Sequence, residues 1–237
     1  MRVAMLGTGS SGNATFIETD GYRFLIDAGF SGKKTKNKLK KIGIDISTLS
    51  AIVITHEHGD HVKGAGVLSR RYNLPIHIGK KSYKKVAKKL GKLKEENIKY
   101  IDQDFNLGGT IKVSPFEVLH DSVQTFGFRV KNKSGKVITL ATDIGYITNI
   151  VKQNFKKSNV IVIESNYDYQ MLMKGPYPWH LKNRVKSRTG HLSNDETAKF
   201  IKKIYSNDLQ KAFLAHVSTD NNEYDLVEKV SRDHLTK

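Results

Sequence analysis

Residues 51–64, AIVITHEHGDHVKG, combine a strand pattern with a group of metal-binding side chains. The first five residues are apolar or β-branched, which is typical of a strand in a core. The six that follow contain the potential ligands His56, His58, Asp60 and His61. Position 60 is aspartate, so the helical zinc-protease motif H-E-x-x-H is not met. On an extended segment His56 and His58 project to the same side, and a turn at the next glycine lets the other two approach from another angle.

Four potential ligands in one segment suggest more than one metal ion. A zinc ion with three protein ligands does not need all four, whereas two adjacent ions can share them. Further candidates end other strands: His120 closes FEVLH, Asp143 closes ITLATD and His216 closes KAFLAH. We therefore expect one site with His56, His58 and His120, a second with Asp60, His61 and His216, and Asp143 as a bridge. Asp27 also follows a strand, and we expect it to accept a hydrogen bond from a ligand imidazole and orient it.

Length and composition are those of one globular domain, or at most two small ones. The chain has 237 residues, 38% of them hydrophobic, which is enough for a sizeable core, and we expect a single domain over residues 1–237. It contains no cysteine, so its metal ligands must be histidine, aspartate and glutamate. No run approaches the ~18 apolar residues of a spanning helix, and the first apolar stretch is too short for a signal peptide. We expect a cytoplasmic protein without a membrane partner.

The net charge of +17 requires an explanation. Lysine is concentrated in residues 31–43 and 79–96, both with helical spacing. Each run alone is compatible with a solvated helix face. A net charge of this size nevertheless favours a polyanionic partner, because lysines that neutralise phosphates release counterions on binding. Charge therefore points to nucleic acid and carries no sequence specificity.

Strand patterns occur in two groups, separated by helical ones. The expected strands are residues 2–6, 14–19, 22–27, 51–55 and 75–79, then 111–120, 125–130, 136–143, 159–164 and 211–216. The expected helices include the two lysine-rich runs and residues 64–72. This order predicts an α/β fold with two sheets packed face to face and covered by helices.

A glycine-rich segment near the start, GTGSSG (residues 7–12), matches the dinucleotide-binding pattern G-x-G-x-x-G. That function requires a helix to begin at the segment, so that its first turn can hold a pyrophosphate. The following residues, NATFIETD, predict a strand instead. We therefore expect residues 7–13 to form a tight turn between two strands, at the border of the active site.

The order Asp27, HEHGDH, His120, Asp143, His216 is similar to that of the metallo-β-lactamase superfamily. The resemblance implies an αββα sandwich with a dinuclear metal site. Finer segments resemble the YycJ/WalJ family of bacterial DNA exonuclease-like proteins: ESNYD (164–168), GPYPWHLKNRV (175–185), GHLSNDETA (190–198) and LAHVSTDNN (214–222). The resemblance covers essentially the whole chain and implies 5′ to 3′ removal of nucleotides from DNA.

A further histidine, His191, precedes SNDE, in which Ser193 and Glu196 form a capping-box pattern for a helix to about residue 205. In related transfer-RNA-processing enzymes of the superfamily, a histidine before a helix and a glutamate at a strand end form a proton-donating pair. The resemblance gives these roles to His191 and Glu164, which we count as catalytic together with Asp60. The alternative is that His191 only bonds to the start of the helix.

The resemblance implies phosphodiester hydrolysis with two divalent ions per chain. Zinc suits the histidines, whereas the aspartates also suit manganese or iron. The same ligands could serve a thioester or lactone hydrolase, an RNA-processing nuclease, or a nucleic-acid-binding protein that does not cut. Residues 144–190 leave no room for the second domain of clamping RNA nucleases. This disfavours that class, but DNA and RNA are not separated by sequence.

Residues 175–188 interleave aromatic rings with cations, as single-strand stacking grooves do. The candidate contacts are Trp179, Lys182, Arg184 and Arg188, beside Tyr177. The alternative is a loop packed over the core. Together with the charge, this segment favours nucleic acid as the partner over a small acyl substrate, and the family resemblance favours DNA.

Overall fold

The computed structural model describes residues 1–235 and divides the chain into two compact units. The N-terminal unit comprises Met1–Pro115, Ser122–Phe126 and Lys131–Gly135, and the C-terminal unit comprises Phe116–Asp121, Gly127–Val130 and the chain from Lys136 onward. Within the described residues there are two six-stranded sheets, with orders β1-β2-β3-β4-β5-β6 and β12-β11-β10-β9-β8-β7. Both sheets contain parallel and antiparallel pairs. The expected α/β class with two sheets is confirmed, and each sheet is mixed.

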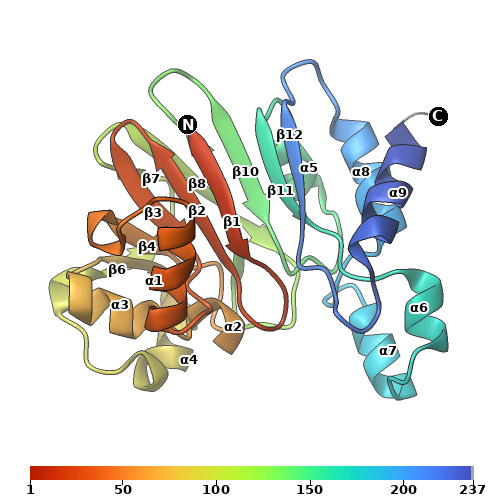
Figure 1. Ribbon diagram of the computed structural model, residues 1–237, viewed down its shortest axis with the longest axis horizontal. Coiled ribbons are helices and arrows are strands. Elements are labelled where there is room, and N and C mark those ends of the chain that lie inside the picture. Colours follow the sequence, from red (N-terminus) through yellow and green to blue (C-terminus); the bar gives the residue numbers. More distant parts are fainter. Residues whose placement is uncertain (236–237) are drawn as a thin grey trace. The chain divides into compact units, whose positions relative to one another are not determined.

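The N-terminal unit is built on the first sheet, in which β1 to β3 are antiparallel and β3 to β6 are parallel (Figure 1). The strands of this sheet are β1 (Arg2–Gly7), β2 (Ala14–Thr19), β3 (Tyr22–Ile26), β4 (Ala51–Val53), β5 (Ile76–Gly79) and β6 (Ile98–Ile101). The unit also contains β7 (Phe105–Leu107), which belongs to the second sheet. Its helices are α1 (Gly32–Lys41), α2 (Gly59–Val62), α3 (Ala65–Tyr72) and α4 (Lys80–Leu90), with 3-10 turns at Ile46–Thr48 and Glu95–Asn97. The helices contribute Leu39, Leu68 and Leu90 to a buried cluster with Leu25 and Ile52 of the strands.

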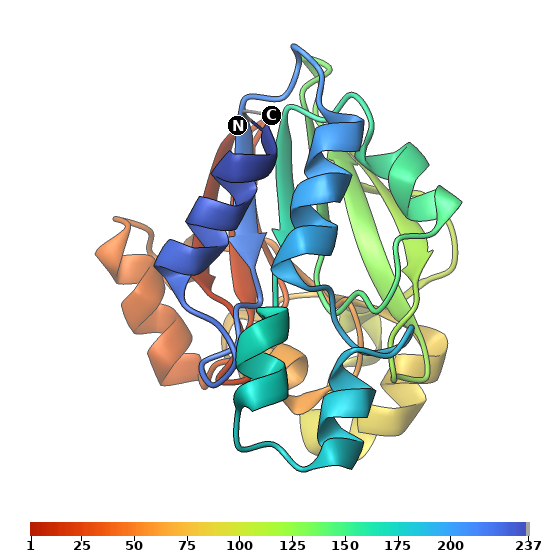
Figure 2. The ribbon, with the colours of Figure 1, turned by 90° about the vertical axis from the view of Figure 1, so that its right-hand side faces the viewer.

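The C-terminal unit takes up the second sheet, with β8 (Ile111–Val118) and β9 (Thr125–Lys131) carrying residues of both units. The other strands are β10 (Val137–Ala141), β11 (Val160–Glu164) and β12 (Lys211–Ala215), which run parallel. The helices are α5 (Asn149–Phe155), α6 (Tyr169–Lys174), α7 (Trp179–Val185), α8 (Asn194–Ile204) and α9 (Tyr224–Leu235). Figure 2 shows α8 and α9 side by side in front of β11 and β12. Phe155 and Phe200 pack edge to face in the core beneath them.

Among residues 1–235 no helix is long and apolar enough to span a bilayer.

The structure confirms most expected elements and corrects some boundaries. The strand expected over residues 51–55 ends at Val53, because the Thr55 amide donates to the Asp27 carboxylate and not to a neighbouring strand. The short strands β6 and β7 were not predicted, since they lack a sustained alternation. The turn over residues 7–13 is confirmed: it joins the antiparallel strands β1 and β2, which excludes the helix that dinucleotide binding would need.

Three chain segments meet backbone to backbone at Gly29, between β3 and α1. The Asn13 amide donates to the Asp60 carbonyl (2.8 Å), and the Gly29 amide donates to the Asn13 carbonyl (2.9 Å). A Cβ on Gly29 would lie 1.6 Å from the Asp60 carbonyl oxygen. We call this contact the Gly29 seam; it fixes the turn over residues 7–13 against the segment that holds the histidines.

Gly29→Ala is therefore expected to destabilise the protein by about 3 kcal/mol or more, because the methyl group cannot be placed without moving two backbones. Gly59→Ala is the control: nothing lies within 4 Å of its Cβ position, and we expect a change within about 0.5 kcal/mol. Urea unfolding of both variants measures the difference. Equal stability of the two alanine variants would contradict the Gly29 seam.

Candidate metal centre

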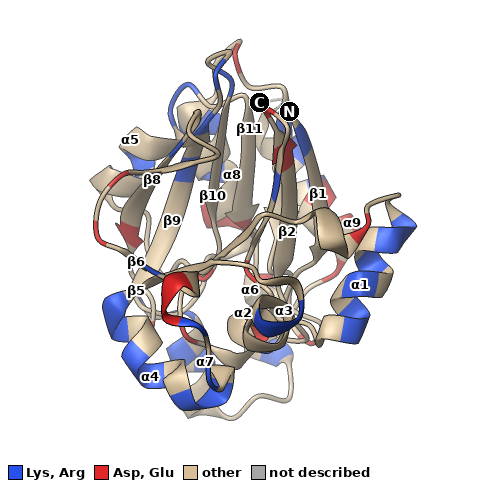
Figure 3. Ribbon diagram, turned by 90° about the vertical axis from the view of Figure 1, so that its left-hand side faces the viewer, with Lys and Arg blue, Asp and Glu red and all other residues tan. Residues whose placement is uncertain are grey.

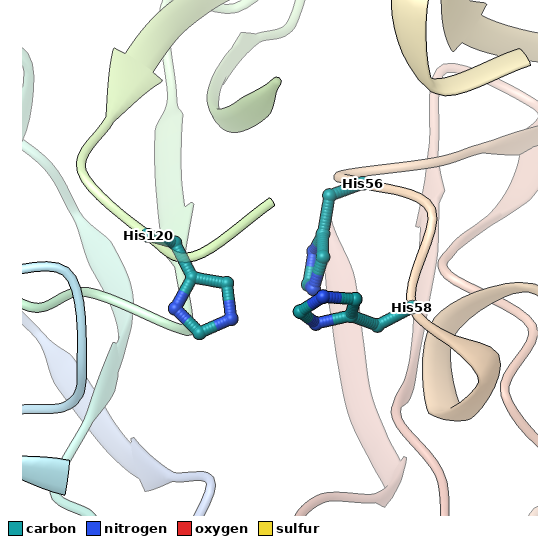
Figure 4. Close-up of side chains that lie close together, drawn as sticks. All are labelled: His56, His58 and His120. Carbon is teal, nitrogen blue, oxygen red and sulfur yellow. The ribbon is translucent and has the colours of Figure 1, made fainter. Parts of the chain in front are cut away.

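The histidines of HEHGDH lie where β4 ends and α2 begins. His56 and His61 have relative exposures of 0%, and their ring centroids are 4.1 Å apart. His58, at the N-cap of α2, sets its ring edge to face with that of His56, with centroids 4.6 Å apart (Figure 4). One segment thus gathers three imidazoles in the N-terminal unit, as the sequence predicted.

Asp27 and Thr55 determine which nitrogen of His56 and His61 faces outward. The Thr55 hydroxyl donates to the Asp27 carboxylate (2.9 Å), so it can only accept from the Nδ1 of His56, 3.0 Å away. The Nδ1 of His61 lies 2.8 Å from Asp27 Oδ2 and is also a donor. Both rings therefore present Nε2 as an acceptor, the form in which neutral imidazole binds metal. Burial raises the pKa of Asp27, and attraction to His61 partly opposes this.

Asp60 lies at the open side of the same group, with a quarter of its side chain exposed. Its Oδ2 is 3.4 Å from His61 Nε2 and accepts a hydrogen bond from Asn13 Nδ2 at 3.0 Å. Sequence reasoning expected the turn over residues 7–13 to border the site, and Asn13, its last residue, does so. The specific roles of Asn13 and Thr55 were missed, because short polar residues beside glycine or a strand are too common to single out.

Glu57 is turned away from the histidines. Its carboxylate accepts from the Val123 amide (2.8 Å) and from the Ser82 hydroxyl (3.1 Å). It therefore anchors the segment, in keeping with the expectation that HEHGDH supplies its three histidines and Asp60 as ligands.

In the C-terminal unit His120 follows β8 and His216 follows β12 (His120 is drawn in Figure 4). The Nδ1 of His120 donates to the Gly190 carbonyl (3.3 Å), and its Nε2 lies 3.6 Å from Asp143 Oδ1. The Nε2 of His216 lies 3.5 Å from the same oxygen. Burial lowers the pKa of His120, which favours the neutral ring. Asp143 is thus placed to face two imidazoles.

Glu164, at the end of β11, organises this group. Its Oε1 accepts from the Nδ1 of His216 (2.6 Å) and of His191 (2.8 Å). Its Oε2 accepts from the amides of Ile144 (2.9 Å) and Leu192 (3.1 Å). Donor atoms of Asp143, Glu164, His191 and His216 all lie within 4.8 Å of one another.

Glu164 and the two histidines that bond to it all have pKa values displaced from their usual ranges. Burial disfavours the Glu164 charge, but His191 and His216 outweigh it and lower the pKa of Glu164 to about 2. Burial likewise disfavours the His191 cation, yet Glu164 and Asp143 raise its pKa to about 9. The pKa of His216 is raised by Asp143 and Glu164 despite its burial. The His191 side chain is 21% exposed and that of His216 only 5%, so of these two rings His191 is the more accessible to solvent.

Three of the expected site residues adopt left-handed backbone: Asp27 (φ 62°), Asp143 (φ 57°) and His216 (φ 54°). Each follows the end of a strand. The left-handed conformation is uncommon outside glycine, although aspartate and histidine adopt it more often than most residues, and it costs roughly 1–3 kcal/mol. Asp27 and Asp143 therefore share a backbone geometry that turns the chain out of the sheet.

The donor sets of both units suit divalent ions. Nδ1 of His56, His61, His120 and His216 is held by a neighbouring group, and the carboxylates of Asp60 and Asp143 lie beside Nε2 atoms. Imidazole nitrogen with carboxylate oxygen fits zinc and manganese. The chain thus has His and Asp clusters of the kind that bind divalent metal.

The four expected nucleic-acid contacts have different surroundings. Trp179 is 61% exposed, with the Lys186 ammonium 5.0 Å from its ring centroid. Arg188 stacks over Tyr146, 4.3 Å from the centroid. Lys182 has an exposure of only 8%, and its ammonium donates to the Met173 carbonyl at 2.7 Å.

Arg184 pairs with Asp121 (2.7 Å), the residue after His120. Lys182 is therefore used within the protein, whereas Trp179, Arg188 and the ion-paired Arg184 keep exposed side chains. Asp121, whose carboxylate also lies 3.1 Å from His120 Nε2, was missed, since a lone aspartate carries no signal in the sequence.

A family model and two similar proteins of known family indicate the same superfamily for this chain. The model of the beta-lactamase superfamily domain matches residues 22–217. Exodeoxyribonuclease YycJ of Bacillus anthracis is 36% identical over 228 residues, covering 95% of this chain and 86% of the relative. Exodeoxyribonuclease WalJ of Streptococcus pneumoniae strain D39 is 35% identical over 243 residues, covering 100% of this chain and 88% of the relative.

Among solved structures, the metallo-beta-lactamase fold protein YhfI of Bacillus subtilis superposes with a TM-score of 0.76 over 99% of this chain and 92% of that one. Its sequence identity is 16%, so the likeness concerns the fold.

Glu164→Gln is expected to lower the free energy of unfolding by about 3 kcal/mol, because the amide removes the buried charge that four hydrogen bonds share. Glu228→Gln is the control, since its carboxylate pairs with Arg232 on an exposed helix face and should contribute under about 0.5 kcal/mol. Urea unfolding of the metal-free proteins measures both. A loss at Glu164 no larger than at Glu228 would show that Glu164 does not organise the group.

Proposed function

Because the chain belongs to the β-lactamase superfamily, and within it to the family of the YycJ and WalJ exodeoxyribonucleases, we propose that it removes nucleotides from DNA in the 5′ to 3′ direction by hydrolysis of phosphodiester bonds. The chain is a metal-dependent hydrolase of the metallo-β-lactamase fold. The observation that carries the proposal is the position of Glu164, which binds both a buried histidine at a strand end and a partly exposed one.

Two divalent ions, zinc or manganese, complete the proposed site. The residues that would hold them are His56, His58, Asp60, His61, His120, Asp143 and His216. When bound, the ions supply Lewis-acid chemistry: they lower the pKa of a water molecule and offset charge on the phosphoryl oxygens. Asp27 and Thr55 keep two of these imidazoles in the tautomer that binding needs. Asp60 is counted as catalytic as well as a ligand, because it lies on the exposed side of its group.

His191 is the proposed proton donor. At neutral pH its raised pKa keeps both ring nitrogens protonated. Nδ1–H is held by Glu164, which directs Nε2–H away from that carboxylate and toward the exposed side. Nε2–H would protonate the sugar oxygen that leaves the phosphorus, a contribution of about 10²–10⁴-fold. Glu164 orients His191 and stabilises its charge, and it also holds His216.

Charge and surface chemistry support nucleic acid, with DNA favoured, over a small acyl substrate. The chain carries a net charge of +17, and Figure 3 shows Lys and Arg distributed along α1 and α4. Phosphate backbones gain affinity from such a surface by counterion release. Trp179 and Arg188 add an exposed ring and an exposed cation, as strand binding requires. A thioester or lactone hydrolase would have no use for these features.

His58→Ala and Asp60→Ala should each reduce DNA cleavage at least about 100-fold, because each removes a proposed ligand. The assay uses 5′-labelled single- and double-stranded DNA, RNA of the same sequence and a generic thioester, with zinc or manganese added. His234→Ala is the control, since that ring bonds within α9. The wild-type protein should carry about two ions per chain by elemental analysis. Turnover of the thioester alone would refute the substrate, and cleavage that survives both substitutions would refute the metal mechanism.

His191→Ala separates proton donation from structural support. On DNA, whose leaving oxygen needs a proton, we expect a loss of at least about 100-fold in kcat. On the p-nitrophenyl ester of thymidine monophosphate, which releases a stable anion, the loss should be under about 10-fold. The measurement is kcat on both substrates at one pH. Equal losses on the two substrates would assign His191 a structural role instead.

A further inference from the structure

A hollow of about 390 Å³ opens beside Asp60 within the N-terminal unit. It is lined by Ser10 and Ser11 of the turn over residues 7–13, by Asp60, and by Lys63 and Lys89. Backbone at Gly29 and Gly59 closes its wall. We call it the Ser10 hollow. Its volume lies within the ~300–1,000 Å³ of sites that hold small ligands.

The charge of the Ser10 hollow is arranged for an anion. Lys63 follows α2 and Lys89 belongs to the last turn of α4, so two separate elements bring exposed ammonium groups to one space. The single carboxylate that lines it, Asp60, is partnered by Asn13 and is a proposed metal ligand. Once an ion binds there, the anionic end of the hollow is neutralised and its overall charge is positive.

The turn that forms the floor is held rigidly. A Cβ on Gly7 or Gly12 would lie 2.5 or 2.7 Å from the Phe30 ring, so the ring fills the space that side chains would need. The ammonium groups of Lys34 and Lys38 lie 4.7 and 4.6 Å from the centre of that ring. The Gly29 seam fixes the far end of the turn. The exposed hydroxyls of Ser10 and Ser11 are therefore presented on a fixed support.

The donor types favour a phosphate over a base. Of the described residues that line the hollow, none is aromatic, so a base has no ring on which to stack. Lysine ammonium and serine hydroxyl groups are common partners of phosphate oxygens in nucleic-acid complexes. The remaining exposed lysines of α4, including Lys81 and Lys85, continue the positive surface away from the hollow.

We propose that the Ser10 hollow binds the phosphate that neighbours the scissile one on the same DNA strand, with Lys63 and Lys89 as its cations and Ser10 and Ser11 as its hydroxyl donors. This inference rests on the proposed function, since it takes the scissile phosphate to lie at Asp60. Binding of this second phosphate would make the protein prefer a DNA strand over a substrate with a single phosphodiester.

The test is binding of a ten-nucleotide fluorescent oligothymidylate, in which one phosphate at a time is replaced by a neutral methylphosphonate. Fluorescence anisotropy is measured at 4 °C with zinc present, so that an ion can occupy the site at Asp60, and readings are taken before any cutting is detectable on a gel. In the wild-type protein, replacement at one position near the end should weaken binding most. In the double variant Lys63→Gln with Lys89→Gln, the affinity for the oligonucleotide should fall roughly tenfold. The slope of log affinity against log salt concentration should become shallower by ~0.7 per lost phosphate contact. The methylphosphonate that weakens binding most to the wild-type protein should have no further effect on this variant.

Lys81→Gln with Lys85→Gln is the matched control, because it removes the same charge from α4 outside the hollow. It should weaken all oligonucleotides alike and keep the position dependence. A hollow variant that keeps the wild-type position dependence would overturn the proposal, as would a wild-type protein that shows none. If DNA is bound in the expected pattern but never cut, the proposed function fails and the phosphate site stands. If DNA is cut but the hollow variant binds like the wild type, the proposed function stands and the phosphate site at the Ser10 hollow is refuted.

Discussion

Hydrogen bonds to histidine Nδ1 are the constraint on which the orientation of the candidate metal ligands in each unit depends. Thr55 and Asp27 hold the Nδ1 atoms of His56 and His61, and Glu164 and a backbone carbonyl hold those of His216 and His120. Each ring then presents Nε2 in one direction. Rotation of a ring would leave a buried donor and acceptor unpaired, at about 1–3 kcal/mol. Asp27, Thr55 and Glu164, at the ends of β3, β4 and β11, and the loop carbonyl of Gly190 supply these bonds at fixed positions. The fold alone therefore sets the orientation of the imidazoles.

Much of this arrangement can be predicted from the sequence because strands and ligands follow local rules. Strand residues 14–19 and the capping box at Ser193 were predicted as observed, since alternation and capping act over a few residues. The seven expected metal ligands were chosen by the same route: His56, His120, Asp143 and His216 come at the end of apolar runs, and His58, Asp60 and His61 belong to the segment that follows the first of these runs. Strand ends bring polar residues to one edge of a sheet. Asp27 was placed for the same reason, and its carboxylate is bonded to His61.

Other features depend on tertiary contacts that spacing does not encode. Lys182 has the spacing of a surface cation, but its ammonium is used by the Met173 carbonyl. Glu164 was paired with His191 by resemblance, whereas its second bond, to His216, requires β11 and β12 to be neighbours. β6 and β7 are too short for periodicity to detect. Sequence thus predicts which side chains could react, and the fold decides which of them are occupied by structural bonds.

The Gly29 seam determines which sequence changes this part of the protein can accept during evolution. It is made of backbone atoms, so it constrains the length of the turn over residues 7–13 and the absence of a side chain at position 29, but not the identity of the two serines at the tip. Those serines could be exchanged without disturbing the histidines behind them. The preference for a ligand could therefore drift through single substitutions at the tip, while an insertion in the turn would disrupt the histidine segment itself.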